Sequence, residues 1–205
     1  MKPETGTTND GTWRVFCAIE IAQEIREAVV EHISGLRRAV PEAQASWSRP
    51  ENIHLTLKFL GDLSQTRVEQ LSEAASRAAS RSTPFRIELE QTGCFPTHGS
   101  PRVLWIGIND PDSKLAELHA HLEEECAKEG FEKEARRYHP HLTIARLRKP
   151  QGARTLAAEH EELEFSPTQI VVRELLVIRS ELGRGGSRYT VIARHSLTAE
   201  KGTNS

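Results

Sequence analysis

The sequence predicts an α+β fold with two pseudo-symmetric lobes, each a mainly antiparallel sheet with flanking helices, around a central cleft. Three observations predict this fold. Apolar residues recur at strand spacing in some segments and at helical spacing in others, the links are short, and one short motif occurs once in each half. The 205 residues are enough for one such domain, which we expect at residues 12–197, with flexible ends at 1–11 and 198–205.

The first half alternates between strand-like and helix-like segments. Helices are expected where apolar residues recur every three or four positions, and the first of them ends before Pro41. Gly61-Asp62 is expected to break the strand that precedes it, and Ser64 is a suitable N-cap for the next helix. The predicted order is a strand at 13–19, a helix at 21–40, a strand at 53–60, a helix at 65–81, and strands at 85–89 and 102–108 joined by a loop with Gly93, Pro96, Gly99 and Pro101.

The second half repeats this alternation. Apolar residues from Leu115 to Cys126 predict a helix that Gly130 ends in the C-cap position. A strand follows at about 140–147, and after it comes a poorly patterned segment. Two strands at 175–178 and 189–193 are linked by a glycine-rich loop at 183–186. The chain is therefore expected to hold about three helices.

Composition excludes several classes of protein. A hydrophobic content of 37% and a charged content of 27% fit a globular protein, and no apolar run approaches the roughly 20 residues that span a bilayer. The N-terminal residues carry no apolar signal core, and the three cysteines are far apart without metal-type spacing. We therefore expect a cytoplasmic protein with no membrane partner and with free thiols.

Charge is not evenly distributed along the chain. The net charge is −2, which excludes a generally basic coat for nucleic acid. Residues 131–150 nevertheless hold six basic and two acidic residues, a net +4, and residues 179–194 hold four arginines against one glutamate. A local positive field of this kind suits a small anionic substrate or an RNA end, although such residues also occur on ordinary solvated faces.

The repeated motif is His-x-Thr followed by an aliphatic residue. Residues 54–57 read His-Leu-Thr-Leu and, 87 positions later, residues 141–144 read His-Leu-Thr-Ile. Because side chains alternate faces along a strand, His54 and Thr56 share one face and the leucines share the other. Each motif would therefore offer an imidazole and a hydroxyl roughly 6–7 Å apart, and two such strands could place two imidazoles across a cleft.

Paired histidines suit displacement at phosphorus. One neutral ring can activate a water or hydroxyl while one protonated ring supplies a proton to the departing oxygen. Thr56 and Thr143 could donate hydrogen bonds to the non-bridging phosphate oxygens. No metal and no other cofactor are needed for this chemistry.

The same residues have simpler explanations. One histidine of the pair could be an ordinary core or surface residue, and the threonines could be present for their strand propensity. His139 and His141, with His54 as a third ligand, could instead bind a metal, although no carboxylate lies within the two motif strands. The other six histidines have no repeating context and are interpreted as structural.

The two motifs with their flanks are specific enough to suggest a family. Residues 52–61 read Asn-Ile-His-Leu-Thr-Leu-Lys-Phe-Leu-Gly, and residues 139–146 read His-Pro-His-Leu-Thr-Ile-Ala-Arg. Gly93-Cys-Phe-Pro96, Arg102-Val-Leu-Trp105 and the terminal strand after Ser180 support them. Over nearly the whole chain, from Arg14 to about Arg194, the sequence resembles the 2H phosphoesterase superfamily, and within it the bacterial RNA 2',3'-cyclic phosphodiesterases, formerly called 2'-5' RNA ligases.

The resemblance implies a fold and a reaction. The fold would be bilobal, with the motifs facing each other, and the reaction would be metal-independent hydrolysis of a terminal 2',3'-cyclic phosphate on RNA to a 2'-phosphate. By motif, the resemblance makes His54 the proton donor to the 3'-oxygen and His141 the proton acceptor that activates water, with Thr56 and Thr143 on the phosphate. The reverse reaction would join a 5'-hydroxyl to the cyclic phosphate in a 2'-5' linkage.

Partners and alternatives derive from the same resemblance. The expected partner is RNA with a 2',3'-cyclic phosphate end, tRNA fragments among the candidates, and the protein is expected to be a monomer. A second hypothesis keeps the chemistry but changes the substrate to a small cyclic nucleotide, a cyclic ADP-ribose phosphate or a 2'-5' oligonucleotide. A third is a non-catalytic protein that binds RNA ends, which would not need two titratable groups.

Two further residues are candidates for substrate contact. His139 shares the face of His141 by strand alternation and could touch RNA or shift the pKa of its neighbour, or it could be an exposed residue at the start of the strand. Arg146 lies an odd number of residues from His141, so ideal alternation places it on the opposite face. A twist or bulge would be needed for Arg146 to reach the phosphate.

Overall fold

The structure is a computed structural model that describes residues 11–183 and 186–198. The predicted flexible ends, 1–11 and 198–205, lie almost entirely outside the described residues, and so does the centre of the 183–186 loop. The limits expected for the domain stay a prediction. None of the helices in the described part of the chain combines the length and the apolar character needed to cross a membrane.

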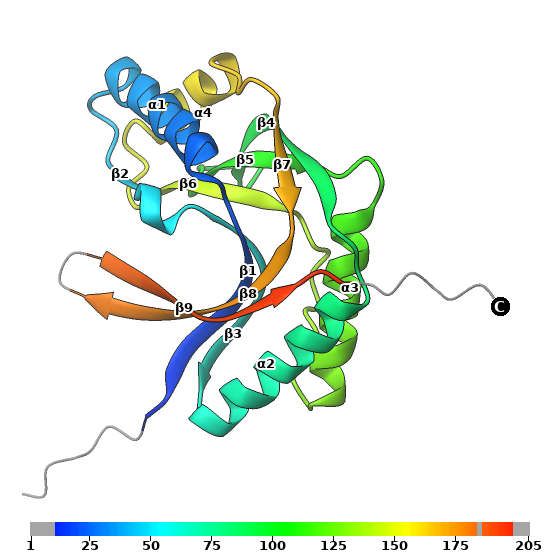
Figure 1. Ribbon diagram of the computed structural model, residues 1–205. Coiled ribbons are helices and arrows are strands. Elements are labelled where there is room, and N and C mark those ends of the chain that lie inside the picture. The colour runs from blue at the N-terminus through cyan, green and yellow to red at the C-terminus, as the bar shows by residue number, and fades with distance from the viewer. Residues whose placement is uncertain (1–10, 184–185, 199–205) are drawn as a thin grey trace, which may run out of the picture.

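Two antiparallel sheets form the framework of the molecule (Figure 1). The first has the strand order β3-β1-β8-β9, and every neighbouring pair is antiparallel. Its strands are β1 (Trp13–Glu20), β3 (His54–Leu63), β8 (Glu174–Gly183) and β9 (Gly186–Ser196). The second sheet has the order β2-β6-β5-β4-β7 and is also antiparallel throughout. Its strands are β2 (Ala45–Trp47), β4 (Phe85–Phe95), β5 (Val103–Asn109), β6 (His141–Leu147) and β7 (Thr168–Val172).

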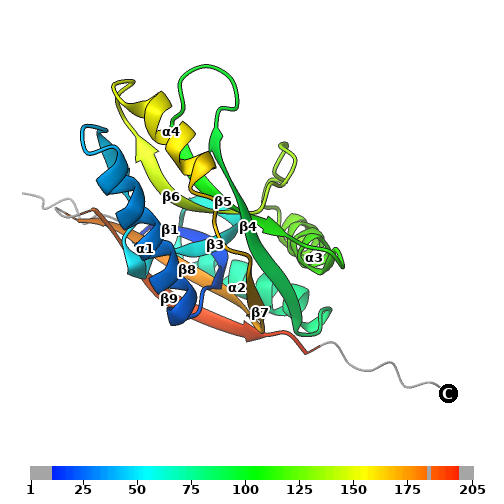
Figure 2. The ribbon, with the colours of Figure 1, turned by 90° about the horizontal axis from the view of Figure 1, so that it is seen from above.

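Helices cover the two sheets in pairs (Figures 1 and 2). Helix α2 (Gln65–Ser80) contacts strands of the first sheet and packs against α3 (Lys114–Lys128), whereas α1 (Gln23–Ala39) and α4 (Ala153–Glu162) contact each other beside the second sheet. A short 3₁₀ turn, η1, spans Pro50–Asn52. Buried aliphatic residues of both sheets and all four helices form one continuous core cluster. The fold class predicted from the sequence, α+β with two mainly antiparallel sheets and flanking helices, is confirmed.

Local signals at helix ends behave as predicted. The Ser64 hydroxyl accepts a hydrogen bond from the backbone N–H of Arg67 at 3.4 Å and so caps α2. Val68, Leu71 and the alanines on the same face of α2 are buried, as helical spacing requires. Gly130 has a positive φ of 74° directly after α3, which is the conformation of a C-terminal cap.

The elements predicted from the sequence differ from the structure in three places. Gly61 does not end its strand: β3 continues to Leu63, and Gly61, with φ at 75°, lies at a bulge that glycine tolerates. Strand β4 runs on to Phe95 and so contains Gly93, which was expected in a loop. The segment after β6, which is poorly patterned in the sequence and for which no element was predicted, forms α4 and β7, so the described residues hold four helices where about three were expected.

Candidate active site

The two motif strands, β3 and β6, show the predicted alternation of faces. His54 and Thr56 on β3 are half-buried, while the residues between and after them are buried in the core. His141 and Thr143 on β6 have the same pattern, with Leu142 and Ile144 in the core. Each strand therefore presents an imidazole and a hydroxyl on its partly exposed face.

A bulge comes directly after the threonine in both strands. In the pairing of β5 with β6, Trp105 lies opposite Thr143 and Leu104 lies opposite Ala145, so Ile144 is the additional residue. Because Val103 then lies opposite Arg146, the bulge returns Arg146 to the face that carries Thr143. Ideal alternation had placed Arg146 on the opposite face, and the bulge corrects that expectation.

The bulge in β3 has the same position relative to its motif. Ala18 pairs with Thr56 and Cys17 pairs with Lys58, which leaves Leu57 as the additional residue. Phe59 is therefore on the face of His54 and Thr56, five residues after the histidine, as Arg146 is in β6. Its side chain is 66% exposed. The two motifs thus agree in backbone geometry and differ in the residue that comes after the bulge.

Hydrogen bonds across the two sheets hold the motif strands together. The Tyr138 hydroxyl, three residues before His141, donates to the backbone carbonyl of Thr56 at 3.2 Å. The Ser48 hydroxyl donates to the backbone carbonyl of Thr143 at 2.7 Å. Since β2 pairs with β6 and ends at Trp47, the short segment that contains Ser48 and η1 passes from the second sheet to β3 in the first. The first motif therefore begins close to the second.

Each histidine is oriented by a carbonyl two residues before it. Nδ1 of His141 is 2.7 Å from the backbone oxygen of His139, and because a carbonyl can only accept, Nδ1 carries the proton. The neutral ring then has its lone pair on Nε2, where it can act as a base. A backbone hydrogen bond of the same kind joins His54 to Asn52.

Aromatic rings surround His54. The ring centroid of Phe16 is 4.7 Å from that of His54, and the centroid of Tyr189 is 5.1 Å from it. Burial removes water from the imidazolium and lowers the pKa of His54 to about 4, against a smaller opposite effect of its backbone hydrogen bond with Asn52. His54 is therefore neutral at pH 7 in the free protein.

His141 lies among aromatic and basic groups. Phe95 and Trp105 approach its ring, with centroid distances of 5.3 and 6.3 Å. Burial lowers the pKa of His141, and the nearby charges of His139 and Arg146 lower it further, while the backbone hydrogen bond acts in the opposite direction.

His139 lies outside the strand but beside the site. It is exposed and precedes β6, and its ring centroid is 5.1 Å from Trp105 and 6.1 Å from His141. The structure thus brings His139 close to His141, as expected. Among residues 11–183 and 186–198, however, no three His, Cys, Asp or Glu side chains are grouped so that they could bind a metal ion. The alternative ligand set of His54, His139 and His141 is therefore not brought together.

Sequence reasoning missed the aromatic residues around both histidines. Phe16, Phe95, Trp105 and Tyr189 come from four different strands, β1, β4, β5 and β9, and no local pattern connects them with the motifs. One usable signal was Gly93: a Cβ there would lie 2.4 Å from the indole of Trp105, so glycine lets that ring lie across β4.

Two of the six remaining histidines have a structural role in the core. His32 of α1 and His160 of α4 are joined by a 2.9 Å hydrogen bond, and His160 also bonds to the backbone oxygen of Trp105 at 2.9 Å. The pair therefore fixes α1 and α4 to the central strand of the second sheet.

Comparisons with known proteins agree with this architecture. Residues 20–184 match the model of the 2'-5' RNA ligase superfamily. A protein of Methanothermobacter thermautotrophicus named RNA 2',3'-cyclic phosphodiesterase is 33% identical over 86% of this chain and 95% of its own. The Escherichia coli protein of the same name is 32% identical over 90% of this chain and 97% of its own.

Solved structures show the same arrangement of elements. Protein TT0787 of Thermus thermophilus superposes with a TM-score of 0.74 at 26% identity, covering 91% of this chain and 99% of that one. Escherichia coli LigT in complex with 3'-AMP superposes with a TM-score of 0.72 at 29% identity, covering 92% of this chain and 99% of that one. Because the family model matches most of the sequence and these proteins share its fold over nearly their whole length, the chain belongs to the 2'-5' RNA ligase superfamily.

Proposed function

We propose that this protein hydrolyses the terminal 2',3'-cyclic phosphate of RNA to a 2'-phosphomonoester. The observation that carries the proposal is the pair of equivalent His/Thr faces on β3 and β6 in a chain of this superfamily. Curated relatives over most of its length are named RNA 2',3'-cyclic phosphodiesterase, which indicates the substrate class. The residues required are two imidazoles and two hydroxyls, so no cofactor or metal is part of the mechanism.

The proposed reaction divides the proton transfers between the histidines. Nε2 of His141, its lone pair free, accepts a proton from water as the water oxygen bonds to phosphorus. As the bond between phosphorus and the 3'-oxygen breaks, His54 donates a proton to that oxygen, leaving a 3'-hydroxyl and a 2'-phosphate. Thr56 and Thr143 donate hydrogen bonds to the non-bridging oxygens, where negative charge increases in the transition state.

The proton that His54 donates must be taken up when the substrate binds. Burial lowers the pKa of both histidines, so both are neutral in the free protein near pH 7. The negative charge of a bound phosphodiester favours the protonated form of a nearby imidazole, and His54 gains its proton in this way. Substrate binding is therefore coupled to proton uptake, which calorimetry in buffers of different ionisation enthalpy measures directly.

The proposal also specifies the cellular setting. The substrates are RNA ends in the cytoplasm, with tRNA fragments among them, and the protein acts as a monomer. Hydrolysis is the direction favoured in the cell. In the 2'-5' joining reaction a 5'-hydroxyl takes the place of water, so His141 accepts its proton and His54 again donates to the departing 3'-oxygen.

Single-residue variants test the mechanism. An oligoribonucleotide with a 2',3'-cyclic phosphate end is incubated with the protein and with His54→Ala and His141→Ala, and the product is identified as a 2'- or 3'-phosphate. Each variant should lose at least about 10²-fold in kcat, the usual effect of removing a general acid or base. His121→Ala, on α3 away from both motifs, is the control and should retain activity.

Three outcomes contradict the proposal. Full activity in both histidine variants excludes the paired mechanism. Inhibition by EDTA that added metal reverses shows metal dependence. A 3'-phosphate product shows that the 2'-oxygen is the leaving group. Turnover of small cyclic nucleotides without turnover of the oligonucleotide would support the alternative substrate class.

A further inference from the structure

A basic pocket lies at the end of β6, beyond the His/Thr face. It has a volume of about 550 Å³ and is formed by two loops that are far apart in sequence. The loop between β4 and β5 and the loop between β6 and α4 lie at the same end of the second sheet (Figure 2). The lining residues are Ser100, Pro101, Arg102, Leu147, Arg148, Lys149 and Pro150.

Backbone hydrogen bonds fix the two loops against each other. The N–H of Leu147 donates to the carbonyl of Arg102 at 2.8 Å, and the N–H of Arg102 donates to the carbonyl of Phe95 at 2.7 Å. Leu147 is buried, while Arg102, Arg148 and Lys149 are exposed. The main chain of the pocket is thus fixed, and its basic side chains face solvent.

The charge of the pocket is not neutralised within its own two loops. Residues 91–109 and 135–158, which include both loops, contain no aspartate or glutamate. Within the part of the chain that the structure describes, Arg102, Arg148 and Lys149 form no ion pair. They remain available to an anion from solvent.

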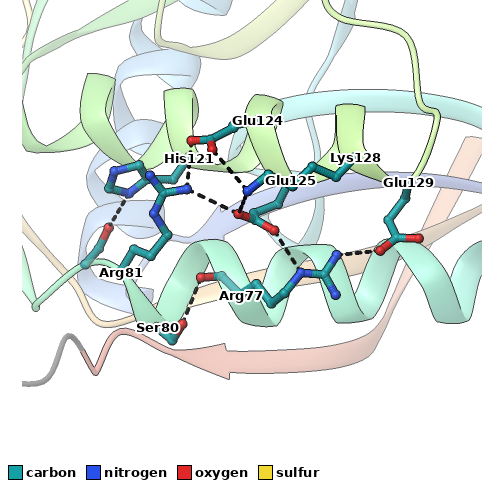
Figure 3. Close-up of polar contacts among 9 residues, drawn as sticks. Arg77, Ser80, Arg81, His121, Glu124, Glu125, Lys128 and Glu129 are labelled. Atoms are coloured by element: carbon teal, nitrogen blue, oxygen red, sulfur yellow. Dashed lines mark hydrogen bonds and ion pairs between the residues drawn. The ribbon is translucent and has the colours of Figure 1, made fainter.

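The basic residues between α2 and α3 provide a contrast. Arg77 bonds to Glu125 and Glu129, and Arg81 and Lys128 each bond to Glu124 and Glu125 (Figure 3). The two arginines join the end of α2 to α3, Lys128 pairs within α3, and all three cations are neutralised by carboxylates. The pocket at the end of β6 has the opposite composition, and that difference indicates a ligand with several negative charges.

The position of the pocket connects it with the His/Thr face. Along β6, His141 and Thr143 are followed by Arg146 on the same face, and the pocket begins at the next residue. Seven residues of strand separate His141 from Arg148, a distance on the order of 20 Å. This is further than a single nucleotide extends, so a molecule that occupies both the histidines and the pocket is longer than a mononucleotide.

We propose that this pocket binds backbone phosphates of the RNA strand upstream of its cyclic-phosphate end. The proposal rests on the function proposed above and defines its substrate as an oligonucleotide rather than a cyclic mononucleotide. Arg146 lies between the two sites and continues the basic path from the reacting phosphate to the pocket. Arg102, Arg148 and Lys149 contact phosphates without reading the bases, so binding depends on strand length and salt and not on sequence.

A comparison of substrate lengths tests the proposal. kcat/KM is measured for a 2',3'-cyclic mononucleotide and for cyclic-phosphate-ended oligoribonucleotides of increasing length, with the protein and with Arg148→Ala/Lys149→Ala. The unsubstituted protein should favour the longer substrates. The double variant should lose about tenfold in kcat/KM on oligonucleotides through KM, while the mononucleotide changes by less than about twofold.

Salt and a matched variant complete the test. Loss of two phosphate contacts should reduce the slope of log KM against log salt by about 1.4 for a single strand. Arg86→Ala/Arg173→Ala removes two exposed charges near the other end of β4, where Arg86 pairs with Val171 of β7, and should change neither substrate. Equal losses on both substrate lengths, or no loss on the oligonucleotide, would overturn the proposal.

Direct binding separates this proposal from the proposed function. Fluorescence anisotropy with an oligoribonucleotide that already ends in a 2'-phosphate measures affinity without turnover. If the protein hydrolyses no cyclic phosphate, a tenfold weaker affinity of Arg148→Ala/Lys149→Ala in this assay still supports the pocket. If hydrolysis is observed and this affinity is unchanged, the pocket proposal alone fails.

Discussion

Strands β3 and β6 carry the same motif in the same backbone geometry but in different surroundings. β3 is an edge strand, and aromatic rings of Phe16 and Tyr189 flank its histidine. β6 lies inside its sheet between β2 and β5, and its histidine has His139 and Arg146 nearby. One backbone pattern therefore provides two imidazoles with different electrostatic environments.

The different surroundings affect the pKa of the two histidines through different causes. Among the described residues, burial lowers the pKa of His54 and its backbone hydrogen bond with Asn52 acts in the opposite direction. Burial also lowers the pKa of His141, and the charges of His139 and Arg146 lower it further. The proposed assignment of His54 as donor and His141 as acceptor therefore rests on the motifs, and it requires a bound phosphate to raise the pKa of His54 from about 4.

The largest expected effect distinguishes donor from acceptor. In a cyclic phosphate with sulfur in place of the 3'-oxygen, the leaving thiolate needs no proton, because a thiol has a pKa near 8.5. His54→Ala should lose at least about 10²-fold on the oxygen substrate and less than about tenfold on the sulfur substrate. His141→Ala should lose at least about 10²-fold on both, as measured in single-turnover assays.

A threonine variant provides the control for the comparison of the oxygen and sulfur substrates. The Thr56→Ala variant, which affects the phosphate and not the leaving group, should lose the same factor on both substrates. Rescue of His141→Ala in place of His54→Ala would reverse the assignment of the two strands.

The next effect concerns the two threonines. Thr56→Val and Thr143→Val keep the shape and remove the hydroxyl donor, so each should lower kcat by about 10-fold to 100-fold with little change in KM. Thr→Ser at the same positions should recover most of the activity. A variant that loses only affinity for substrate would show that its hydroxyl binds the ground state and does not stabilise the transition state.

A smaller effect distinguishes the residues located directly after the two bulges. Arg146→Ala and Phe59→Ala should each raise KM for a cyclic-phosphate oligonucleotide by about tenfold, the first through lost charge and the second through lost stacking on a base. Only the loss in Arg146→Ala should shrink as salt is raised, because salt screens charge and not stacking. Similar salt dependence in the two variants would contradict a charge contact at Arg146 and base stacking at Phe59.

The sequence was sufficient to predict the faces of the two motifs but not the bulges beyond them. Alternation of apolar residues correctly placed His54 with Thr56 and His141 with Thr143. The bulges could not be predicted because Leu57-Lys58 and Ile144-Ala145 are ordinary strand residues, and only the register against β1 and β5 reveals them. The place of Arg146 was therefore decided by tertiary pairing.

Other features were hidden for a similar reason. Helix α4 buries only a short apolar stripe, completed by His160, so its periodicity is weak in the sequence. The order β3-β1-β8-β9 places the last strand of the chain in the same sheet as the first motif. Tyr189 reaches His54 through that non-sequential order, which no local pattern encodes.

The smallest expected effect uses stability to compare the two histidines. The pKa of His54 is about 4 in the folded protein and 6.5 unfolded, so the unfolded state binds more protons as pH falls from about 6.5 towards 4. The free energy of unfolding therefore decreases over that range. His54→Gln should reduce this loss by on the order of 1 kcal/mol, after allowance for the partial exposure of the ring.

Urea unfolding at pH 7 and pH 4.5 measures this loss for the protein, His54→Gln and His141→Gln. The contribution of the buried pair His32–His160 is common to all three and cancels in the comparison. The pKa of His141 is lowered as well, so His141→Gln should also flatten the dependence, but by less than His54→Gln. Equal flattening in the two variants would show that the aromatic surroundings of β3 do not disfavour the imidazolium more than those of β6.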